Sequence, residues 1–191
     1  TTGTNNSSLG YQSLYSNDSG FENVAVGVSS LFTNTSGERN VAIGANTLLL
    51  NSTGDENVAI GYEALNLATG SFNVAVGRDA GADLTTGVNN TFLGYGAGLG
   101  VSTGNSNTII GSNIFGLAGG LSGNIIIGDG NGNQRINVDS SGNVGFGDTT
   151  PDAKLDVELA ENTEAIRISD TTNTDSVGFF TGNEDPNGVV S

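Results

Sequence analysis

The chain has 191 residues, and its 20 acidic side chains outnumber 5 basic ones, so the net charge at neutral pH is -15. A charge of this sign opposes binding to the phosphate backbone of a nucleic acid and to an anionic membrane surface. Cysteine and histidine are both absent, which excludes disulfide bonds, thiolate metal sites and the usual pairing of a nucleophile with a histidine base. The negative charge therefore predicts that the chain has no nucleic-acid partner. Because no apolar run approaches the length of a membrane span, we also expect no membrane insertion.

A five-residue motif, Asn-Val-Ala-Val/Ile-Gly, recurs along the first two thirds of the chain. It is clearest in the copies that begin at Asn23, Asn40, Asn57 and Asn73. In the later copies the three central residues differ, while the asparagine and the glycine are retained. Successive asparagines lie 17 residues apart, with one spacing of 16. A fixed period of this length is the signature of a stacked repeat. The asparagines of the copies are Asn6, Asn23, Asn40, Asn57, Asn73, Asn90, Asn107 and Asn124.

Each copy has the features of a short strand between two bends. The three residues between asparagine and glycine are β-branched or small, and the run is too short for a helix. One glycine closes this run, and a second glycine stands in a Ser/Thr-Gly pair before each asparagine, where it suits a bend or a close approach between layers. A hydrophobic residue such as Leu31 or Leu48 follows the closing glycine and leaves room for a second short strand or one turn of helix. The sequence therefore predicts an all-β protein, a parallel β-solenoid (β-roll) of about eight 17-residue coils, about 40 Å long, followed by a short antiparallel β segment.

The side chains of each predicted strand form two faces. The first and third residues, such as Val41 and Ile43, share one face, and the middle residue, such as Ala42, points the other way. Both faces are apolar, so one fills the interior of the coil and the other must be covered. We expect other copies of the same chain to cover the alanine face. We also expect the asparagines to stack into a hydrogen-bonded ladder at one corner.

The chain divides into three predicted parts. Residues 1–128 form the repeat array, and residues 129–157 form a transition or neck with an alternating strand at 135–139, a turn and a second strand at 143–147. Residues 158–191 are predicted to begin a C-terminal antiparallel β region that is truncated at the end of the sequence. Since methionine is absent, we expect the chain to be a piece of a longer polypeptide. Three runs alternate like antiparallel strands separated by polar turns, at 155–159, 165–168 and 177–180.

No group of residues predicts a catalytic, cofactor-binding or metal site. The acids of the array flank the corners, where solvated turns are the preferred interpretation, and a catalytic pair of carboxylates would have to converge across a cleft. Residues 129–133 place oxygen ligands at alternate positions, as calcium loops do, but Gln134 and Ser140 stand where such a loop needs a glycine and an acid. The glycines of residues 94–100 lack the lysine and the helix of a phosphate-binding loop.

Two further patterns follow the repeat. Tyrosine recurs directly after the closing glycine, at Tyr11, Tyr62 and Tyr95. Outward aromatic rings could contact a sugar, but packing against the neighbouring coil or subunit is the preferred interpretation. Sequons for glycosylation arise from the repeat consensus itself and therefore carry little weight, at Asn17, Asn34 and Asn51.

The repeat resembles a known group of proteins. Residues 53–65, Thr-Gly-Asp-Glu-Asn-Val-Ala-Ile-Gly-Tyr-Glu-Ala-Leu, resemble the head repeats of trimeric autotransporter adhesins, which form left-handed parallel β-rolls in trimers. The longer coils of this chain are more similar to the variant found in bacteriophage tail fibres and related secreted fibres. Residues 142–157 are similar to the junction that such fibres place between the repeat head and the C-terminal region. The resemblance implies a parallel homotrimer.

The same resemblance implies a structural, non-enzymatic role. We expect a trimeric rod or head segment in the tail fibre of a bacteriophage or of a tail-like particle, located in the virion tail, that supports attachment to a host cell surface. The implied partners are further copies of the chain, other tail or fibre proteins, and a glycan or protein receptor on the host. The alternative is the head domain of a bacterial trimeric surface adhesin, on the bacterial cell surface. A glycan-cleaving spike is a third class, but it would need a carboxylate-lined groove that the sequence does not indicate.

Overall fold

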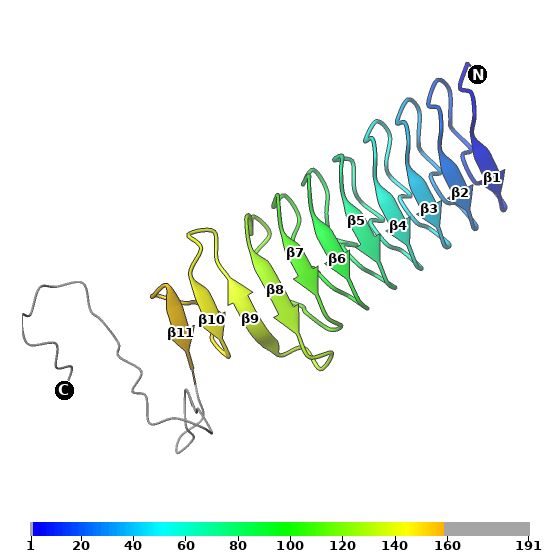
Figure 1. The fold of residues 1–191 in the computed structure, drawn as a ribbon. Coiled ribbons are helices and arrows are strands. Elements are labelled where there is room, and N and C mark those ends of the chain that lie inside the picture. Colours follow the sequence, from blue (N-terminus) through cyan, green and yellow to red (C-terminus); the bar gives the residue numbers. More distant parts are fainter. Residues whose placement is uncertain (1, 159–191) are drawn as a thin grey trace, which may run out of the picture. The chain divides into compact units, whose positions relative to one another are not determined.

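The computed structural model describes residues 2–158, which form one 11-stranded sheet with the strands in sequence order. The first eight strands pair in parallel, one per coil, with seven complete turns between them (Figure 1). No helix occurs within the described residues, so the predicted all-β class and the parallel β-solenoid are confirmed. The strands are β1 (Ser7–Leu9), β2 (Val24–Val26), β3 (Val41–Ile43), β4 (Val58–Ile60), β5 (Val74–Val76), β6 (Thr91–Leu93), β7 (Thr108–Ile110), β8 (Ile125–Gly128), β9 (Gln134–Val138), β10 (Val144–Phe146) and β11 (Leu155–Val157).

Neighbouring coils are in register along the whole stack, so equivalent residues lie beside each other. The coil between Asn57 and Asn73 is one residue shorter than the others, yet Val58 still pairs with Val74. The missing residue falls in the turn that leads to Gly70. A slip of one residue in the sheet itself would have turned every inner side chain outward. Variation in length is therefore confined to a corner.

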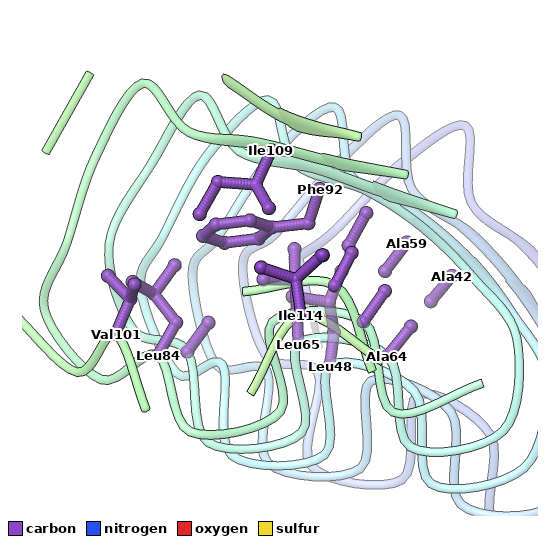
Figure 2. Close-up of a cluster of buried hydrophobic side chains, with 14 of the residues drawn as sticks. Ala42, Leu48, Ala59, Ala64, Leu65, Leu84, Phe92, Val101, Ile109 and Ile114 are labelled. Atoms are coloured by element: carbon purple, nitrogen blue, oxygen red, sulfur yellow. The ribbon is translucent and has the colours of Figure 1, made fainter. Parts of the chain in front are cut away.

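The alanine face of the strands points into the coil, and the prediction that other copies cover this face is wrong. Ala42 and Ala59 are fully buried, whereas Ile43 and Ile60 on the opposite face are exposed. The reason is the volume that remains inside the coil. A leucine from the turn on the far side occupies the interior, as Figure 2 shows for Leu48, and a methyl group fills the space left beside the strand.

The segment after each closing glycine is neither a second strand nor a turn of helix. Every second residue has a positive φ, as in Ser29 (55°) and Leu31 (50°), and the same positions repeat this conformation in other coils. The backbone of the segment still bonds to the neighbouring coils, because Leu31 N donates to Thr47 O (3.0 Å) and Ser29 N donates to Tyr11 O (2.9 Å). A left-handed backbone costs leucine about 1–2 kcal/mol, which the complete burial of its side chain offsets.

The two glycines of each coil meet different constraints. Gly61 closes β4 with a φ of 135°, and a β-carbon there would lie 2.6 Å from the carbonyl carbon of Gly77. Gly54, in the Thr-Gly corner, has no positive φ, but a β-carbon there would lie 2.5 Å from Gly70 O. Close approach between layers therefore requires both glycines, and only the closing glycine adds a backbone conformation that other residues avoid.

The interior changes its residues along the stack but stays filled. The inner strand residue is alanine in β2 to β5, and in β6 it becomes Phe92, which is fully buried. At the leucine position across the coil, Gly81 and Gly98 replace Leu65. A β-carbon on Gly98 would lie 2.5 Å from Phe92 Cε1, and one on Gly81 would lie 2.5 Å from Phe92 Cδ2. Earlier coils combine alanine on the strand with leucine across the coil, and here phenylalanine is combined with glycine instead, which keeps the core filled. Figure 2 shows the ring of Phe92 inside the coil.

The sheet changes direction after the eighth coil. β9 pairs antiparallel with both β8 and β10, as the predicted strand, turn and strand require. β11 pairs in parallel with β10, so the prediction of an antiparallel strand at 155–159 is wrong. The cause is the length of the connection. Residues 147–154 return the chain to the start of β10, so β11 runs in the same direction as β10. A short hairpin would have placed the two strands in opposite directions. The predicted strands at 165–168 and 177–180, and the predicted C-terminal region beyond Glu158, lie outside the described residues.

Replacing Phe92 with alanine is expected to lower the free energy of unfolding by about 3–5 kcal/mol, because the removed ring leaves a cavity in the core. The double variant Phe92→Ala with Gly98→Leu restores the alanine and leucine of the earlier coils, and it should regain a large part of this loss. Urea unfolding of the wild type and the two variants measures both effects. If the double variant were no more stable than Phe92→Ala, the exchange of volume across the coil would be refuted.

Candidate functional surfaces

The repeated asparagines form one continuous buried ladder. Asn57 donates to the side-chain oxygen of Asn40 through its backbone N–H (2.9 Å) and through its side-chain amide (3.1 Å). The same amide donates to Gly70 O at the next corner (2.9 Å). From Asn23 to Asn107 the ladder asparagines are at most 1% exposed. The predicted ladder is confirmed, and because its amides bond to one another and to the corners, it holds the coils together and presents no group to a ligand.

A second, shorter ladder contains the predicted sequons. Asn34 donates through its side-chain amide to Asn17 Oδ1 (2.8 Å) and to Gly37 O (3.0 Å), and Asn51 donates to Asn34 Oδ1 (3.4 Å). Asn34 and Asn51 are fully buried. In the folded coil these two side chains are therefore committed to packing and cannot receive a glycan.

The acids of the array lie along the outside of the coils, and several of them bond to a neighbouring coil. Asp55 Oδ1 accepts a hydrogen bond from Glu38 N (2.9 Å), and Asp83 Oδ2 accepts one from Gly100 N (2.8 Å). Each carboxylate thus ties one coil to the next, at a different place along the stack. Within residues 2–158, no three carboxylate, histidine or cysteine side chains gather where they could hold a metal ion.

The glycines of residues 94–100 make room for aromatic side chains. Gly96, Gly98 and Gly100 all have positive φ. Gly98 faces the ring of Phe92, and Gly96 faces the ring of Phe115. This glycine-rich segment is therefore explained by packing, as its lack of a following lysine and helix indicates.

The turn at residues 129–133 is held by its own carboxylate. Asp129 Oδ1 accepts hydrogen bonds from the N–H groups of Asn131 (2.9 Å) and Asn133 (3.3 Å), and Asp129 Oδ2 accepts them from Asn133 Nδ2 (2.9 Å) and Arg135 Nε (2.9 Å). The side-chain bond from Asn133, the backbone bond from Asn131 and the Arg135 guanidinium hold the pKa of Asp129 well below its usual range. Both carboxylate oxygens are used within the turn, which fits the glycine-rich turn better than a calcium loop.

The same turn recurs between β9 and β10. Asp139 Oδ1 accepts hydrogen bonds from Ser141 N and Asn143 N (2.8 Å each), and Asp139 Oδ2 accepts one from Asn143 Nδ2 (3.0 Å). The bond from the Asn143 backbone is the main cause that lowers the pKa of Asp139. Both turns share the spacing Asp-x-x-x-Asn. This spacing is visible in the sequence and predicts a turn held by the aspartate, but a comparison with the calcium-loop pattern does not detect it.

The tyrosines that follow the closing glycines are exposed, and two of them contact the guanidinium group of an arginine. Arg78 lies between two of the rings, with its Cζ 5.5 Å from the ring centroid of Tyr62 and 5.8 Å from that of Tyr95. Phe115 meets Tyr95 edge-on, at 6.2 Å between ring centroids. Tyr11 lies apart from this cluster, in the first coil. The contacts fit the packing interpretation of the tyrosines, and they assign Arg78 a cation–π role that its place in the repeat did not indicate.

The third residues of the parallel strands form an exposed apolar row, here called the outer row. Five of its members, from Ile43 to Ile127, are between 36% and 45% exposed. Because these residues pair in register from coil to coil, the row is continuous along the stack, and β1 to β8 contain no charged residue. The outer row consists of Leu9, Val26, Ile43, Ile60, Val76, Leu93, Ile110 and Ile127.

Comparisons of the chain with models of protein families, with characterised proteins and with solved structures gave no match. The resemblance to fibre and adhesin repeats therefore rests on the residues of the repeat. The described part of the chain also contains no helix that could cross a lipid bilayer.

We expect the contribution of Asp139 to stability to depend on pH. The pKa of its carboxyl is lowered by folding from an unfolded value of about 3.9. The contribution is therefore fully present above about pH 4 and is lost as the pH falls toward the lower, folded pKa. Urea unfolding of the wild type and Asp139→Asn at pH 6 and pH 3 measures this. The gap between the two midpoints should be wide at pH 6 and narrow at pH 3, and an equal gap at both values would contradict the role of the carboxylate.

Proposed function

We propose that this chain is a structural, non-enzymatic segment of a trimeric fibre in a bacteriophage tail or tail-like particle. In this role the solenoid is a stiff rod that supports attachment to a host cell surface. The observation that carries the proposal is the outer row, an apolar surface that runs the length of the rod and that residues 2–158 leave partly exposed. Parallel copies of the chain, side by side around one axis, would cover it.

The composition of the strand face supports lateral association. The chain carries a net charge of -15, but β1 to β8 contribute none of it, and the acids of the repeat array lie in its corners and turns. Two copies can therefore approach along this face without bringing like charges into direct contact. The first strand residues, such as Val74 (38% exposed), widen the apolar surface next to the outer row.

The area of the face indicates which other residues take part. Eight layers at about 4.8 Å and a width of about 7 Å give a strip of about 270 Å². A stable interface buries about 800 Å² on each partner. The strip alone is too small, so the proposed interface includes the exposed aromatic residues that flank the strands in sequence, such as Tyr62 beside β4 and Phe72 beside β5. Three copies around an axis give each chain two such contacts.

The rigidity of the rod supports the role in attachment. Each coil bonds to its neighbours through the sheet, the asparagine ladder and the turn segment, so bending would break several hydrogen bonds at one level. A rod of this kind transmits force and keeps a tip at a fixed distance from a particle. Host-surface glycans or proteins are the proposed targets of the complete fibre, and other fibre proteins are its proposed neighbours.

The proposal is tested by the mass of the native protein in solution, measured by light scattering. We expect the wild type to have the mass of three chains, and Ile60→Glu to lower it, because three copies would bring three carboxylates into one apolar contact. The matched control is Leu67→Glu, which changes a residue of equal exposure (38% against 37%) in the turn of the same coil.

Circular dichroism of both variants shows whether the solenoid is intact. A wild type with the mass of one chain would refute the trimer. A trimer that Ile60→Glu and Leu67→Glu weaken equally would refute the outer row as its contact.

A further inference from the structure

The asparagines of the solenoid differ in how well their side chains are protected against chemical change. An asparagine side chain loses ammonia when the backbone nitrogen of the following residue attacks its Cγ atom. A branched side chain on that following residue hinders the attack, and hydrogen bonds that hold the amide oppose it. From Asn23 to Asn124, each ladder asparagine is followed by valine, threonine or isoleucine. The amide of Asn57, for example, also donates to Asn40 Oδ1 (3.1 Å) and Gly70 O (2.9 Å), so the ladder is protected.

The turn between β8 and β9 contains an asparagine that lacks this protection. Asn131 is followed by Gly132, and this is the one Asn-Gly pair within residues 2–158. Asn131 is exposed. Neither its side-chain amide nor the N–H of Gly132 forms a hydrogen bond with any residue that the structure describes. Because glycine has no β-carbon, no side chain of Gly132 hinders the approach of its nitrogen to Asn131 Cγ.

The other bonds of the turn hold its backbone and leave this side chain unheld. The backbone N–H of Asn131 donates to Asp129 Oδ1 (2.9 Å), and Asp129 N donates to Asn133 O (3.1 Å). Gly130 and Gly132 have φ angles of 83° and 93°. A β-carbon on Gly130 would meet no atom within 4 Å, so this side of the turn is open to water. The two reacting atoms therefore lie in a turn that is held in place and reached by water.

The aspartate of the same turn is protected, although glycine follows it as well. An aspartate forms the corresponding ring from its protonated acid, because an ionised carboxylate resists attack by a nitrogen. Asn133 Nδ2 donates to Asp129 Oδ2 (2.9 Å) and Asn131 N donates to Asp129 Oδ1, and these bonds hold the pKa of Asp129 well below its usual range. The anchor of the turn therefore stays ionised and intact while Asn131 is free to react.

We propose that Asn131 is a site of spontaneous covalent modification, in which its side-chain amide is converted to a carboxylate with water as the co-reactant. The nitrogen of Gly132 bonds to Asn131 Cγ and gives up its proton, which leaves with the side-chain nitrogen as ammonia. The product is a cyclic imide. Water then opens the ring at one of its two carbonyl groups. Opening at Cγ gives aspartate, and opening at the backbone carbonyl gives isoaspartate, in which the main chain runs through the side chain.

The products change the joint between the repeat array and β9. Aspartate or isoaspartate adds one negative charge to a chain whose net charge is -15. Isoaspartate also carries the main chain through Cβ and Cγ, so it lengthens the turn by one carbon atom. The pairing of β8 with β9 already shifts its register between Ile127 and Gly128, next to this turn. The reaction thus alters, slowly and irreversibly, the point where the parallel coils end, and it leaves the ladder unchanged.

The test incubates the full chain at mildly alkaline pH and follows each asparagine by mass mapping of peptides, while circular dichroism confirms that the solenoid stays folded. Deamidation at Asn131 should be at least tenfold faster than at Asn143, whose amide donates to Asp139 Oδ2 and which is followed by valine. Chromatography separates isoaspartate from aspartate, and both should appear at residue 131. In the variant Asn131→Gln the modification should be lost, because glutamine would have to form a larger ring.

The urea-unfolded chain supplies the reference in which no turn holds Asn131. We expect the folded rate at Asn131 to lie within tenfold of the unfolded rate. A folded rate more than tenfold slower, or one no faster than that at Asn143, would overturn the proposal, because the turn would then keep the nitrogen of Gly132 away from Asn131 Cγ. The readout follows one residue of each chain, so it does not depend on the number of chains in the assembly.

Discussion

The buried asparagine ladder is the constraint on which the rest of the solenoid depends. A corner that turns inside the protein leaves backbone N–H and C=O groups away from water, and each of these must find a partner. One asparagine per coil meets this need in two directions, since its oxygen accepts from the next coil while its amide donates to the preceding asparagine and to a corner carbonyl. The ladder therefore fixes the phase of every coil, including the one of 16 residues, in which Asn73 bonds to Asn57 as the other ladder asparagines bond to their neighbours.

Once the phase is fixed, packing divides the remaining residues between inside and outside. The interior is narrow, so a large side chain on one wall requires a small one on the other, as Phe92 does with Gly98. The outer wall has no such limit, and it carries isoleucine, valine and leucine in a row without charge. The outer row is not part of the core of the solenoid, and the proposed assembly depends on it.

The sequence predicted the period, the parallel coils and the ladder because each depends on residues that repeat at a fixed position. It did not predict which strand face points inward, since Ala42 and Ile43 are both apolar and only the leucine across the coil decides between them. Alternating left-handed residues such as Leu31 were also unforeseen, because leucine has no intrinsic preference for positive φ and burial imposes it. The contact of Arg78 with two rings, and the parallel pairing of β11, depend on particular side chains and on one connection, which no repeat pattern describes.

The most direct test of this account is the stability of Asn57→Ala beside that of Asn66→Ala, in the turn of the same coil. Removal of Asn57 leaves the N–H of Asn73 and the carbonyl of Gly70 without their partners in a buried corner. Each lost partner costs about 1–3 kcal/mol, so we predict a loss of about 2–6 kcal/mol in the free energy of unfolding. Asn66→Ala should cost less than about 0.5 kcal/mol, as surface substitutions usually do. Equal stability of the two variants in urea unfolding would contradict the claim that the ladder holds the coils together.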